Sequence, residues 1–581
     1  MENPLLSRGQ SNDQTRAIAK QFRRKPELTA STLTRFLDAL SSKPIFRYLI
    51  YSCSAFFFFA VILVPPILGI LLKLNLIGRI FETPDLMSSA LSAIQASFAI
   101  AIFVSIVDVV LGLPMAWYIV RSRSKWLYVI DTLADIPFIV PTVTLGYSLR
   151  LFWSEPEGIS SLFATTVVSP GWLLVVLLHF AFSYPVVVRV IVGALYDYQL
   201  VYEEAARTLG AAPLTVDRTV TFPILKPSII SSFILAFARS LSETGATVMV
   251  AGTFQNGPVF IHRNYNPENP QYGPLVFVSS LLIITSCIVF AIITVLGPKL
   301  CMPIKGVWPV AERKLSSHNI ATTRNSITLL VFLFVVLIPS VYVALPALHA
   351  ITDGTFNKAV SGVGVWSDYW QSLLLSYFVG AIVTLLNLVV GLPLAILIAR
   401  RRFGSLFSKI LDVLVNIPLI VPSIALGFSL RLFWTETLVG IPETALLVFA
   451  HLAVTYPYFV RAMSAAVERV NMDFEHAARI LGAKPFTVFK TIILPLTKYS
   501  LFSGAVIMFT RSVDETGATL AVTSLKTAPV LLVNWVKTFL SQSTPNTITS
   551  LDIGLGCSFM IIFSFIVLLA LRLMVRGKRR Y

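Results

Sequence analysis

Two pairs of opposite charges lie inside apolar stretches of this 581-residue sequence. Arg239 and Glu243 are four residues apart, and Arg511 and Glu515 repeat that spacing. Residues four apart share one face of a helix, so each arginine can reach its glutamate. Ionised groups are costly inside a membrane, where they pair with one another or face a polar cavity. Two interpretations stay open: each pair neutralises itself and fixes helix packing, or the pairs border a solute path beside the glycine two residues after each glutamate.

Prolines are duplicated in the same way. Pro137 and Pro141 interrupt one apolar stretch, and Pro418 and Pro422 interrupt another at the same spacing. A proline inside a helix frees a carbonyl group, which neighbouring groups in a membrane must satisfy. Duplication at one spacing favours an axial or pore-lining role over ordinary tolerance of proline. The candidate pore or gate residues are those that occur in both copies: Pro137, Pro141, Arg239, Glu243, Gly245, Pro418, Pro422, Arg511, Glu515 and Gly517.

No arrangement in the sequence is typical of an enzyme or of a metal site. The six histidines are scattered, and none has metal-ligand spacing with cysteine or acidic partners. The four cysteines lie in or beside apolar stretches, without the spacing of a disulfide framework. No nucleophile lies beside a base in a recognisable turn. We therefore expect no catalytic residue, no metal and no cofactor.

The composition is that of a protein that spans a membrane many times. Only 13% of the residues are charged, whereas soluble chains carry about a quarter. Apolar stretches of about 20 residues, enough to cross ~30 Å of hydrocarbon, recur along the chain and predict an all-α protein with about twelve transmembrane helices. The third and ninth helices are expected at 127–153 and 408–434, and the fifth and eleventh at 228–250 and 499–523.

The net charge of +17 indicates membrane topology rather than a nucleic-acid partner. Lysine and arginine gather in short loops, and such loops stay on the cytoplasmic side because positive charge resists translocation. The sequence therefore predicts both termini inside, contact with the lipid bilayer and no nucleic acid. The basic loops contain Arg121, Arg123 and Lys125; Lys299, Lys305, Arg313 and Lys314; and Arg400, Arg401 and Arg402.

The chain contains two copies of one design. Ile136–Trp153 reads IPFIVPTVTLGYSLRLFW and Ile417–Trp434 reads IPLIVPSIALGFSLRLFW, with 13 of 18 positions identical. Six helices per half is an even number, so the halves are parallel repeats about an axis along the membrane normal. The predicted organisation is a basic N-terminal tail at 1–46, a six-helix half at 47–300, a linker at 301–324, a second six-helix half at 325–575 and a basic tail at 576–581.

The most informative polar segment lies between the fourth and fifth helices of each half. It reads YEEAARTLGAAPLTVDRTVTFPILKP in the first half and FEHAARILGAKPFTVFKTIILPLTK in the second. Gly210 or Gly482 suits a left-handed helix end, and the proline three residues later suits the first turn of a new helix. The segment is therefore expected to be a helix–turn–helix hairpin that returns to the membrane at Pro223 or Pro495.

Both hairpins resemble the EAA loop of binding-protein-dependent ABC importer permeases. That pattern is Glu-Ala-Ala, three residues, Gly, nine residues, an aliphatic residue, one residue and Leu-Pro. The second copy has His476 where the pattern has Glu, with Glu475 one residue earlier. Whether Glu475 or a weaker histidine contact replaces the acid stays open. The candidate coupling residues are Glu203, Glu204, Ala205, Ala206, Gly210, Pro223, Glu475, His476, Ala477, Ala478, Gly482 and Pro495.

The resemblance implies the type I ABC importer permease fold and a mechanical role. In that family the loop forms a coupling helix that docks on a separate ATPase subunit, and two such subunits rock the helices between inward-facing and outward-facing states. This chain has no G-x-x-x-x-G-K-[ST] phosphate loop, so two separate ATPase subunits are expected as partners. The resemblance also implies an external substrate-binding protein and a place in the bacterial inner membrane.

The transported solute is less constrained. Fused two-half permeases resemble those for ferric iron and thiamine, while single-half relatives serve polyamines, sulfate, molybdate and phosphonates. The ETGAT motif is similar to the inorganic-ion members, so ferric iron is the expected solute, with thiamine, a polyamine, a phosphonate or another inorganic anion as alternatives. A secondary transporter driven by an ion gradient would have the same helix count and symmetry. The two EAA-like loops favour the ABC importer, because a gradient-driven carrier does not need them.

Overall fold

The structure is a computed structural model of the chain. It describes residues 32–575, apart from 123–124, 135, 164, 266–271, 297–298, 300–307, 438–439 and 542–547. Within these described residues, every regular element is helical and no strand occurs. The predicted all-α class is confirmed.

The first half begins after a short helix, α2 (Thr32–Ser42), which lies in the expected N-terminal tail. Its first membrane-spanning helix runs through three segments without a break. The elements of this half are α3 (Pro44–Phe57), η1 (Phe58–Leu63), α4 (Val64–Leu71), η2 (Leu74–Glu82), α5 (Pro84–Arg121), α6 (Lys125–Leu133), α7 (Ile136–Ile139), α8 (Thr142–Trp153), η3 (Ile159–Leu162), α9 (Trp172–Asp197), α10 (Val201–Thr208), α11 (Pro213–Val216), η4 (Asp217–Thr221), α12 (Phe222–Ser242), α13 (Gly245–Val250), α14 (Gly257–Asn264) and α15 (Tyr272–Leu296).

The second half follows the same order. It is preceded by α16 (Pro309–Leu315), which lies in the expected linker. Its elements are α17 (His318–Val331), η6 (Phe332–Leu337), α18 (Ile338–Val341), α19 (Ala344–Thr352), α20 (Thr355–Ser361), α21 (Val365–Ala399), α22 (Ser405–Leu414), α23 (Ile417–Ile420), α24 (Ser423–Thr437), α25 (Glu443–Arg469), α26 (Met472–Ile480), α27 (Pro485–Val488), η7 (Phe489–Ile493), α28 (Leu494–Val513), α29 (Gly517–Val522), α30 (Ala528–Ser541) and α31 (Ser550–Val575).

The number of membrane-spanning helices is close to the prediction. Ten helices of the described residues are long and apolar enough to cross a membrane, and a bent pair raises the number to eleven. That pair is the ninth predicted helix, in which Ser405–Ile420 and Ser423–Thr435 meet at 105°. The corresponding segment of the first half is divided into α6, α7 and α8, and residue 135 within it lies outside the described residues.

The sharp bend lies at the proline pair that the sequence indicated would interrupt the ninth helix, at 408–434. Val421 has an extended conformation with ψ of 131° and directly precedes Pro422. A proline ring clashes with a helical conformation of the residue before it, so the helix ends there. In the first half, Pro141 is itself extended, with ψ of 142°, at the start of α8. In each repeated pair, the second proline thus lies at the beginning of a new helix.

The fifth and eleventh helices, expected at 228–250 and 499–523, are each interrupted within those bounds. The helix α12 ends at Ser242, Glu243 is extended with ψ of 127°, and a separate helix α13 starts at Gly245. The second half is interrupted at the same place, between α28 and α29. The ETGAT motif therefore marks a helix break in the middle of an apolar stretch, which hydropathy does not reveal.

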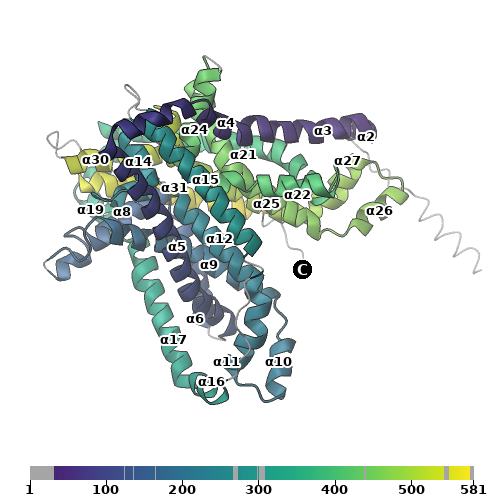
Figure 1. The fold of residues 1–581 in the computed structure, drawn as a ribbon, viewed down its shortest axis with the longest axis horizontal. Coiled ribbons are helices and arrows are strands. Elements are labelled where there is room, and N and C mark those ends of the chain that lie inside the picture. The colour runs from purple at the N-terminus through teal and green to yellow at the C-terminus, as the bar shows by residue number, and fades with distance from the viewer. Residues whose placement is uncertain are drawn as a thin grey trace, which may run out of the picture.

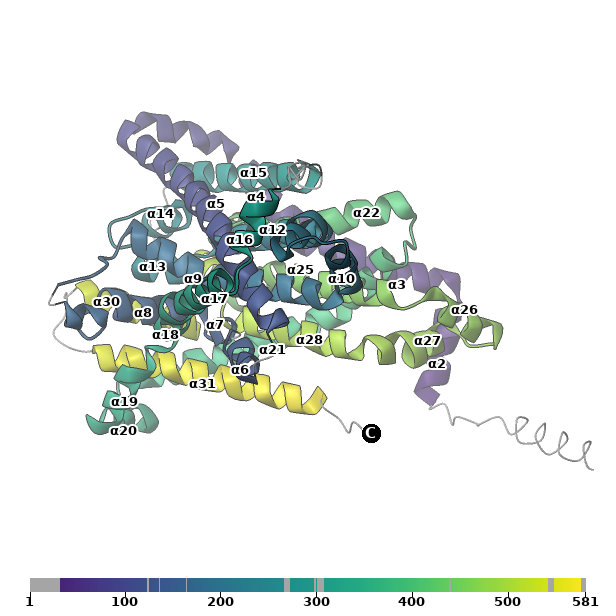
Figure 2. The same ribbon diagram turned by 90° about the horizontal axis from the view of Figure 1, so that it is seen from below.

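The two halves exchange their first membrane-spanning helices. The segments α3, η1 and α4 pack against α21, α24 and α25 of the second half, while α17, η6 and α18 pack against α5, α8 and α9 of the first. Figure 1 shows the consequence: α2 lies beside α27 at the right, and α16 lies beside α11 at the bottom. Figure 2 shows the same two groups from below.

Matching aromatic contacts secure this exchange. The Phe58 ring of η1 stacks on Tyr456 of α25, with ring centroids 5.8 Å apart. The Phe332 ring of η6 stacks in the same way on Tyr184 of α9, at 6.4 Å. All four side chains are buried. Between membrane-spanning helices such contacts stabilise the association through van der Waals packing, so each half depends on the other for part of its core.

Candidate functional site

The two hairpins expected from the EAA-like loops have the same backbone. Helix α10 is followed by Gly210 with φ of +87°, and α26 is followed by Gly482 with φ of +86°. Both values lie in the left-handed region that glycine adopts without strain. A side chain at either position would meet nothing within 4 Å, so the requirement for glycine is conformational rather than spatial. Pro213 and Pro485 then open α11 and α27.

One glutamate of each hairpin faces the membrane-spanning helices. Glu203 is 6% exposed, and it forms an ion pair with Arg121 at the end of α5. Glu475 is 1% exposed and forms an ion pair with Arg400 at the end of α21, at 2.8 Å. The Arg121–Glu203 contact is also a charge-assisted hydrogen bond, which is one of the stronger kinds in proteins. Each hairpin is therefore anchored to the second membrane-spanning helix of its own half.

The next residue of each hairpin points away from the protein. Glu204 and His476 are both exposed, so the histidine departs from the EAA pattern on the outer surface and not at the anchor. Glu475 corresponds to the anchoring Glu203, and His476 corresponds to the exposed Glu204. The alanines that follow, Ala205, Ala206, Ala477 and Ala478, are exposed or partly exposed.

An apolar residue projects from the end of each coupling helix. Leu209 is 89% exposed and its counterpart Leu481 is 87% exposed. Tyr202 and Phe474, at the other end of α10 and α26, are also exposed. Exposed apolar groups that recur on two matched surfaces indicate contact with a partner. The outward faces of α10 and α26 are thus the candidate docking surfaces.

The hairpins return to the membrane through a wider helical turn. The turns η4 and η7 have π-helical geometry and lead directly into α12 and α28. Pro223 and Pro495 lie in the first turn of those helices, where a missing N–H group costs little.

A second candidate site lies at the break in each fifth helix. The Glu243 carboxylate accepts a hydrogen bond from the Ala246 N–H at 2.9 Å, and the Glu515 carboxylate accepts one from Ala518 at 3.0 Å. These N–H groups lie in the first turns of α13 and α29. N–H groups in a first turn have no acceptor within their own helix. Both glutamates therefore stabilise a helix start, and an anion is favoured there by the helix dipole.

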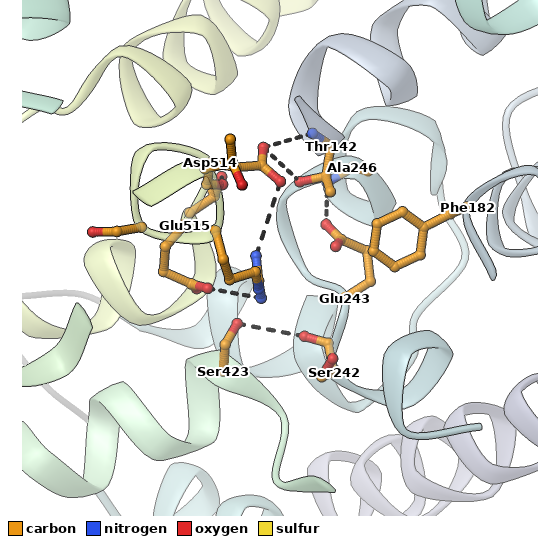
Figure 3. A network of polar contacts seen from close by, with 12 residues as sticks. Thr142, Phe182, Ser242, Glu243, Ala246, Ser423, Asp514 and Glu515 are labelled. Atoms are coloured by element: carbon orange, nitrogen blue, oxygen red, sulfur yellow. Dashed lines mark hydrogen bonds and ion pairs between the residues drawn. The ribbon is translucent and has the colours of Figure 1, made fainter. Parts of the chain in front are cut away.

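The arginine partners of these glutamates are arranged differently in the two halves. Arg511, in the last turn of α28, contacts Glu515 at 2.8 Å and Asp514 at 3.9 Å, both of which follow the end of that helix. In the first half, the guanidinium group of Arg239 lies 3.8 Å from the ring centroid of Phe182. Figure 3 shows this cluster. The predicted i,i+4 ion pair is therefore formed in the second half, whereas Arg239 packs over an aromatic ring.

The two halves meet at this cluster. The backbone N–H of Thr142 donates to the Asp514 carboxylate at 2.6 Å, and Ser423 donates to the Ser242 carbonyl at 3.4 Å (Figure 3). A side chain at Gly245 would come within 2.7 Å of Thr516. The structure therefore brings the repeated glycines and the helix starts after the repeated prolines into one region.

Gly517 makes the corresponding close contact from the second half. A side chain there would lie 2.8 Å from the hydroxyl oxygen of Thr244. The prolines Pro137, Pro141, Pro418 and Pro422 are all buried, and Pro141 and Pro422 immediately precede the Thr142 and Ser423 helix starts.

Each break is held in place by one histidine, and neither histidine was among the candidate residues. His179 contacts the hydroxyl groups of Ser240 and Thr247, at 2.7 and 2.9 Å, and so connects α12 with α13. His451 contacts Ser512 and Thr519 at 2.8 and 2.9 Å. Each histidine is repeated at the same offset as the ETGAT motif, which was the signal available in the sequence. Among the described residues, no group of three or more His, Cys, Asp or Glu side chains could hold a metal ion.

Comparison with known proteins agrees with this duplicated architecture. The family model "binding-protein-dependent transport system inner membrane component" matches residues 108–300 and again residues 391–578. The chain is 23% identical to the putative ferric transport system permease protein FbpB 1 of Haemophilus influenzae, over 80% of this chain and 75% of that protein.

Two further relatives match a shorter part of the chain. The sulfate transport system permease protein CysT of Salmonella typhimurium is 32% identical over 34% of this chain and 72% of its own length. The molybdenum transport system permease protein ModB of Mycobacterium tuberculosis is 36% identical over 29% of this chain and 64% of its own length. The twofold family match confirms the resemblance seen in the EAA-like loops. The chain belongs to the family of inner membrane components of binding-protein-dependent transport systems, and it is an ABC importer permease with two fused halves.

Proposed function

We propose that this permease imports ferric iron. The observation that carries the proposal is the relative from Haemophilus influenzae, which aligns over 80% of this chain and is named a putative ferric permease. The sulfate and molybdenum relatives, by contrast, align over about a third of the chain or less.

The charge of the membrane-centre cluster is consistent with a cationic solute. Three carboxylates, from Glu243, Asp514 and Glu515, lie in the same region as the guanidinium groups of Arg239 and Arg511. The acidic groups of this cluster outnumber its guanidinium groups by one. Such a region favours the approach of a cation and opposes that of sulfate or molybdate.

The proposal is tested by transport in vesicles that hold the chain, its ATPase subunits and its binding protein. Radioactive ferric citrate is expected to accumulate only when ATP is present, and a large excess of sulfate, molybdate or thiamine is expected not to compete. If one of those competitors is taken up with ATP and iron is not, that competitor is the solute and the proposal of ferric iron fails. Uptake that persists without ATPase subunits would contradict the dependence on ATP.

The outward faces of α10 and α26 are the proposed docking surfaces for two separate ATPase subunits. Leu209 and Leu481 support this role because a soluble partner is needed to cover such exposed apolar groups. Anchoring by Glu203 and Glu475 supports it too, since a docked surface must transmit force to the membrane-spanning helices. This placement puts the hairpins and both termini on the cytoplasmic side, with the binding protein on the other.

The contact between the halves at Gly245 and Gly517 is the proposed gate of the solute path. Its closure is supported by the hydrogen bonds that join Thr142 to Asp514 and Ser423 to the Ser242 carbonyl. Because these contacts join different halves, a rocking motion of one half against the other would break them. The separation of α10 and α26 in Figure 1 is consistent with a state in which the ATPase subunits are apart.

A further inference from the structure

The helices α11 and α27 begin without caps of their own. The first N–H groups of any helix have no partner inside it and are usually satisfied by Ser, Thr, Asp or Asn at the preceding position. Here the preceding residues are Ala212 and Lys484, and neither provides a side-chain hydrogen bond. The partners of these N–H groups must therefore come from elsewhere.

In the second hairpin the caps come from α2, which precedes the first half. The Phe486 N–H donates to the Ser41 hydroxyl oxygen at 3.1 Å, and the Thr487 N–H donates to the Asp38 carboxylate at 2.9 Å. The Thr487 hydroxyl group donates to the same carboxylate at 2.5 Å. Asp38 is buried by this contact.

In the first hairpin the caps come from α16, which precedes the second half. The Leu214 N–H donates to the Ser316 hydroxyl oxygen at 3.0 Å. The Thr215 hydroxyl group donates to the Glu312 carboxylate, and Arg218 forms an ion pair with that carboxylate at 2.6 Å. Glu312 is 3% exposed.

The two sets of contacts correspond to each other. Thr215 and Thr487 occupy equivalent positions in the repeated hairpins, and each donates to a buried acid. Ser41 and Ser316 each begin a Ser-Ser pair that follows a leucine at the end of a short helix. The same local solution thus occurs twice, although no residue of α2 or α16 belongs to the hairpin that it caps.

The capping helices are continuous with the exchanged membrane-spanning helices. Ser42 and the start of α3 at Pro44 are two residues apart, and α17 begins three residues after the end of α16. From α2, the chain crosses the second half through α3, η1 and α4, and then joins η2 and α5 of the first half. Each capping helix and the exchanged membrane-spanning helix that follows it form one continuous segment, α2 to α4 or α16 to α18, which we call the strap. The strap connects a hairpin of one half with the rest of the opposite half.

We propose that Asp38 with Ser41 and Glu312 with Ser316 are positioning residues that transmit the movement of each coupling hairpin to the first membrane-spanning helix of the opposite half. This inference rests on the proposed docking of ATPase subunits at the hairpins. Without the caps, a hairpin would still receive its ATPase, but it would move without displacing the strap. ATP hydrolysis would then be separated from opening of the gate.

The test follows gate opening without requiring a known solute. The full chain, with its four native cysteines replaced by serine, carries a Thr244→Cys substitution and is reconstituted with its ATPase subunits. A membrane-impermeant maleimide is added from outside, with and without ATP and vanadate. The caps are removed by Asp38→Ala combined with Glu312→Ala. Matched controls are Arg35→Ala and Arg313→Ala, which alter exposed residues of the same two helices.

A second variant distinguishes transmission from simple stabilisation of a helix start. Ala212→Asp with Lys484→Asp places a capping side chain within each hairpin itself, which satisfies the same N–H groups without the strap. We expect the Asp38→Ala, Glu312→Ala protein to co-purify with its ATPase subunits and to hydrolyse ATP. It should nevertheless lose the ATP-dependent increase in labelling, and the added local caps should not restore that increase.

Each other outcome overturns the inference. Labelling like that of the controls would mean that the caps do not transmit movement. Restoration by the local caps would mean that Asp38 and Glu312 only stabilise α11 and α27. Loss of ATPase co-purification would mean that Asp38 and Glu312 act in docking. If the Thr244→Cys protein with intact caps does not respond to ATP, the proposed gate fails and the inference that rests on it fails as well.

Discussion

The coupling hairpins are repeated almost contact for contact, whereas the membrane-centre cluster is not. Both hairpins have a left-handed glycine, a buried anchoring glutamate, an exposed leucine and caps from the opposite half. At the membrane centre, Asp514 of the second half corresponds to Ser242 of the first. Arg511 forms an ion pair with Glu515, whereas Arg239 lies over the Phe182 ring.

This difference separates two physical requirements. Two surfaces that receive the same kind of partner and the same force must present the same groups, so both copies are kept alike. A solute path on the axis is shared by the two halves, so one half can supply a group that the other lacks. Variants that break the symmetry of the hairpins should therefore act on coupling, and variants that change the centre should act on the solute.

The largest effect is expected from removing both projecting leucines. Leu209→Asp combined with Leu481→Asp should abolish ATPase co-purification and lower uptake about 100-fold. This corresponds to about 2.8 kcal/mol, and losing one interface hot spot costs roughly 2 kcal/mol or more. Folding should be unaffected, since both side chains are exposed. Affinity purification and vesicle uptake measure the two effects. Leu162→Asp, at an exposed site in η3, is the matched control, and unchanged recruitment in the double variant would refute the docking surface.

The two anchors should differ in strength. Glu475 has Arg400, Arg402 and Arg479 within 4 Å, and Arg400 is almost fully buried. Glu475→Gln should lower the opening free energy of α26 by about 3 kcal/mol, because it leaves a buried arginine without its ionised partner.

The comparison for this anchor is Glu203→Gln, which should cost about 1–2 kcal/mol in α10, where Arg121 is more exposed and Thr221 still donates. Hydrogen exchange of the two hairpins measures both values, with Glu204→Gln as an exposed control. Equal losses at the two anchors would contradict the difference.

At the membrane centre, Asp514→Ser would make the second half like the first. The cluster would then hold two carboxylates and two guanidinium groups. If the excess of acidic groups favours a ferric cation, iron uptake should fall about tenfold, equivalent to about 1.4 kcal/mol, while ATPase co-purification is retained. Initial rates of ferric uptake measure the change. Ser242→Asp, which adds an acid at the equivalent position, should not lower the rate, and an unchanged rate in Asp514→Ser would argue against the role of charge.

The smallest effect concerns the pH dependence of the cap at Glu312. The hydrogen bond from Thr215, with the nearby Arg218, holds the pKa of this carboxyl group below its ordinary value of 4.5. A lowered pKa in the folded state means that the stabilising contribution is present above the ordinary value and is lost as pH falls through the lowered value. Exchange protection of α11, which Glu312 contacts through the Thr215 hydroxyl group, should therefore be constant from about pH 5 to 8, apart from the intrinsic rate. Loss of protection within that range would show that Glu312 is not held ionised.

Much of the architecture can be predicted from the sequence because it depends on local or periodic signals. Apolar length predicted the membrane-spanning helices, and the duplicated motifs predicted two fused halves. The hairpin was predictable because glycine and proline act through their own backbone: Gly210 and Gly482 are left-handed whatever surrounds them. The Arg511–Glu515 pair matches the predicted spacing, but Glu515 lies beyond the end of α28 at Val513, so the break in the chain and not helix geometry alone sets this contact.

Contacts between distant segments were decided by the tertiary structure. Hydropathy could not locate the helix break at Glu243, because the chain remains apolar on both sides and the break is held by His179. Nor could it reveal that Glu203 and Glu475 turn inward while Glu204 and His476 turn outward. The capping of α27 by α2 joins residues more than 440 positions apart. Such a contact exists only because the first membrane-spanning helices are exchanged, and burial of Phe58 and Phe332 in the opposite half is the physical reason for that exchange.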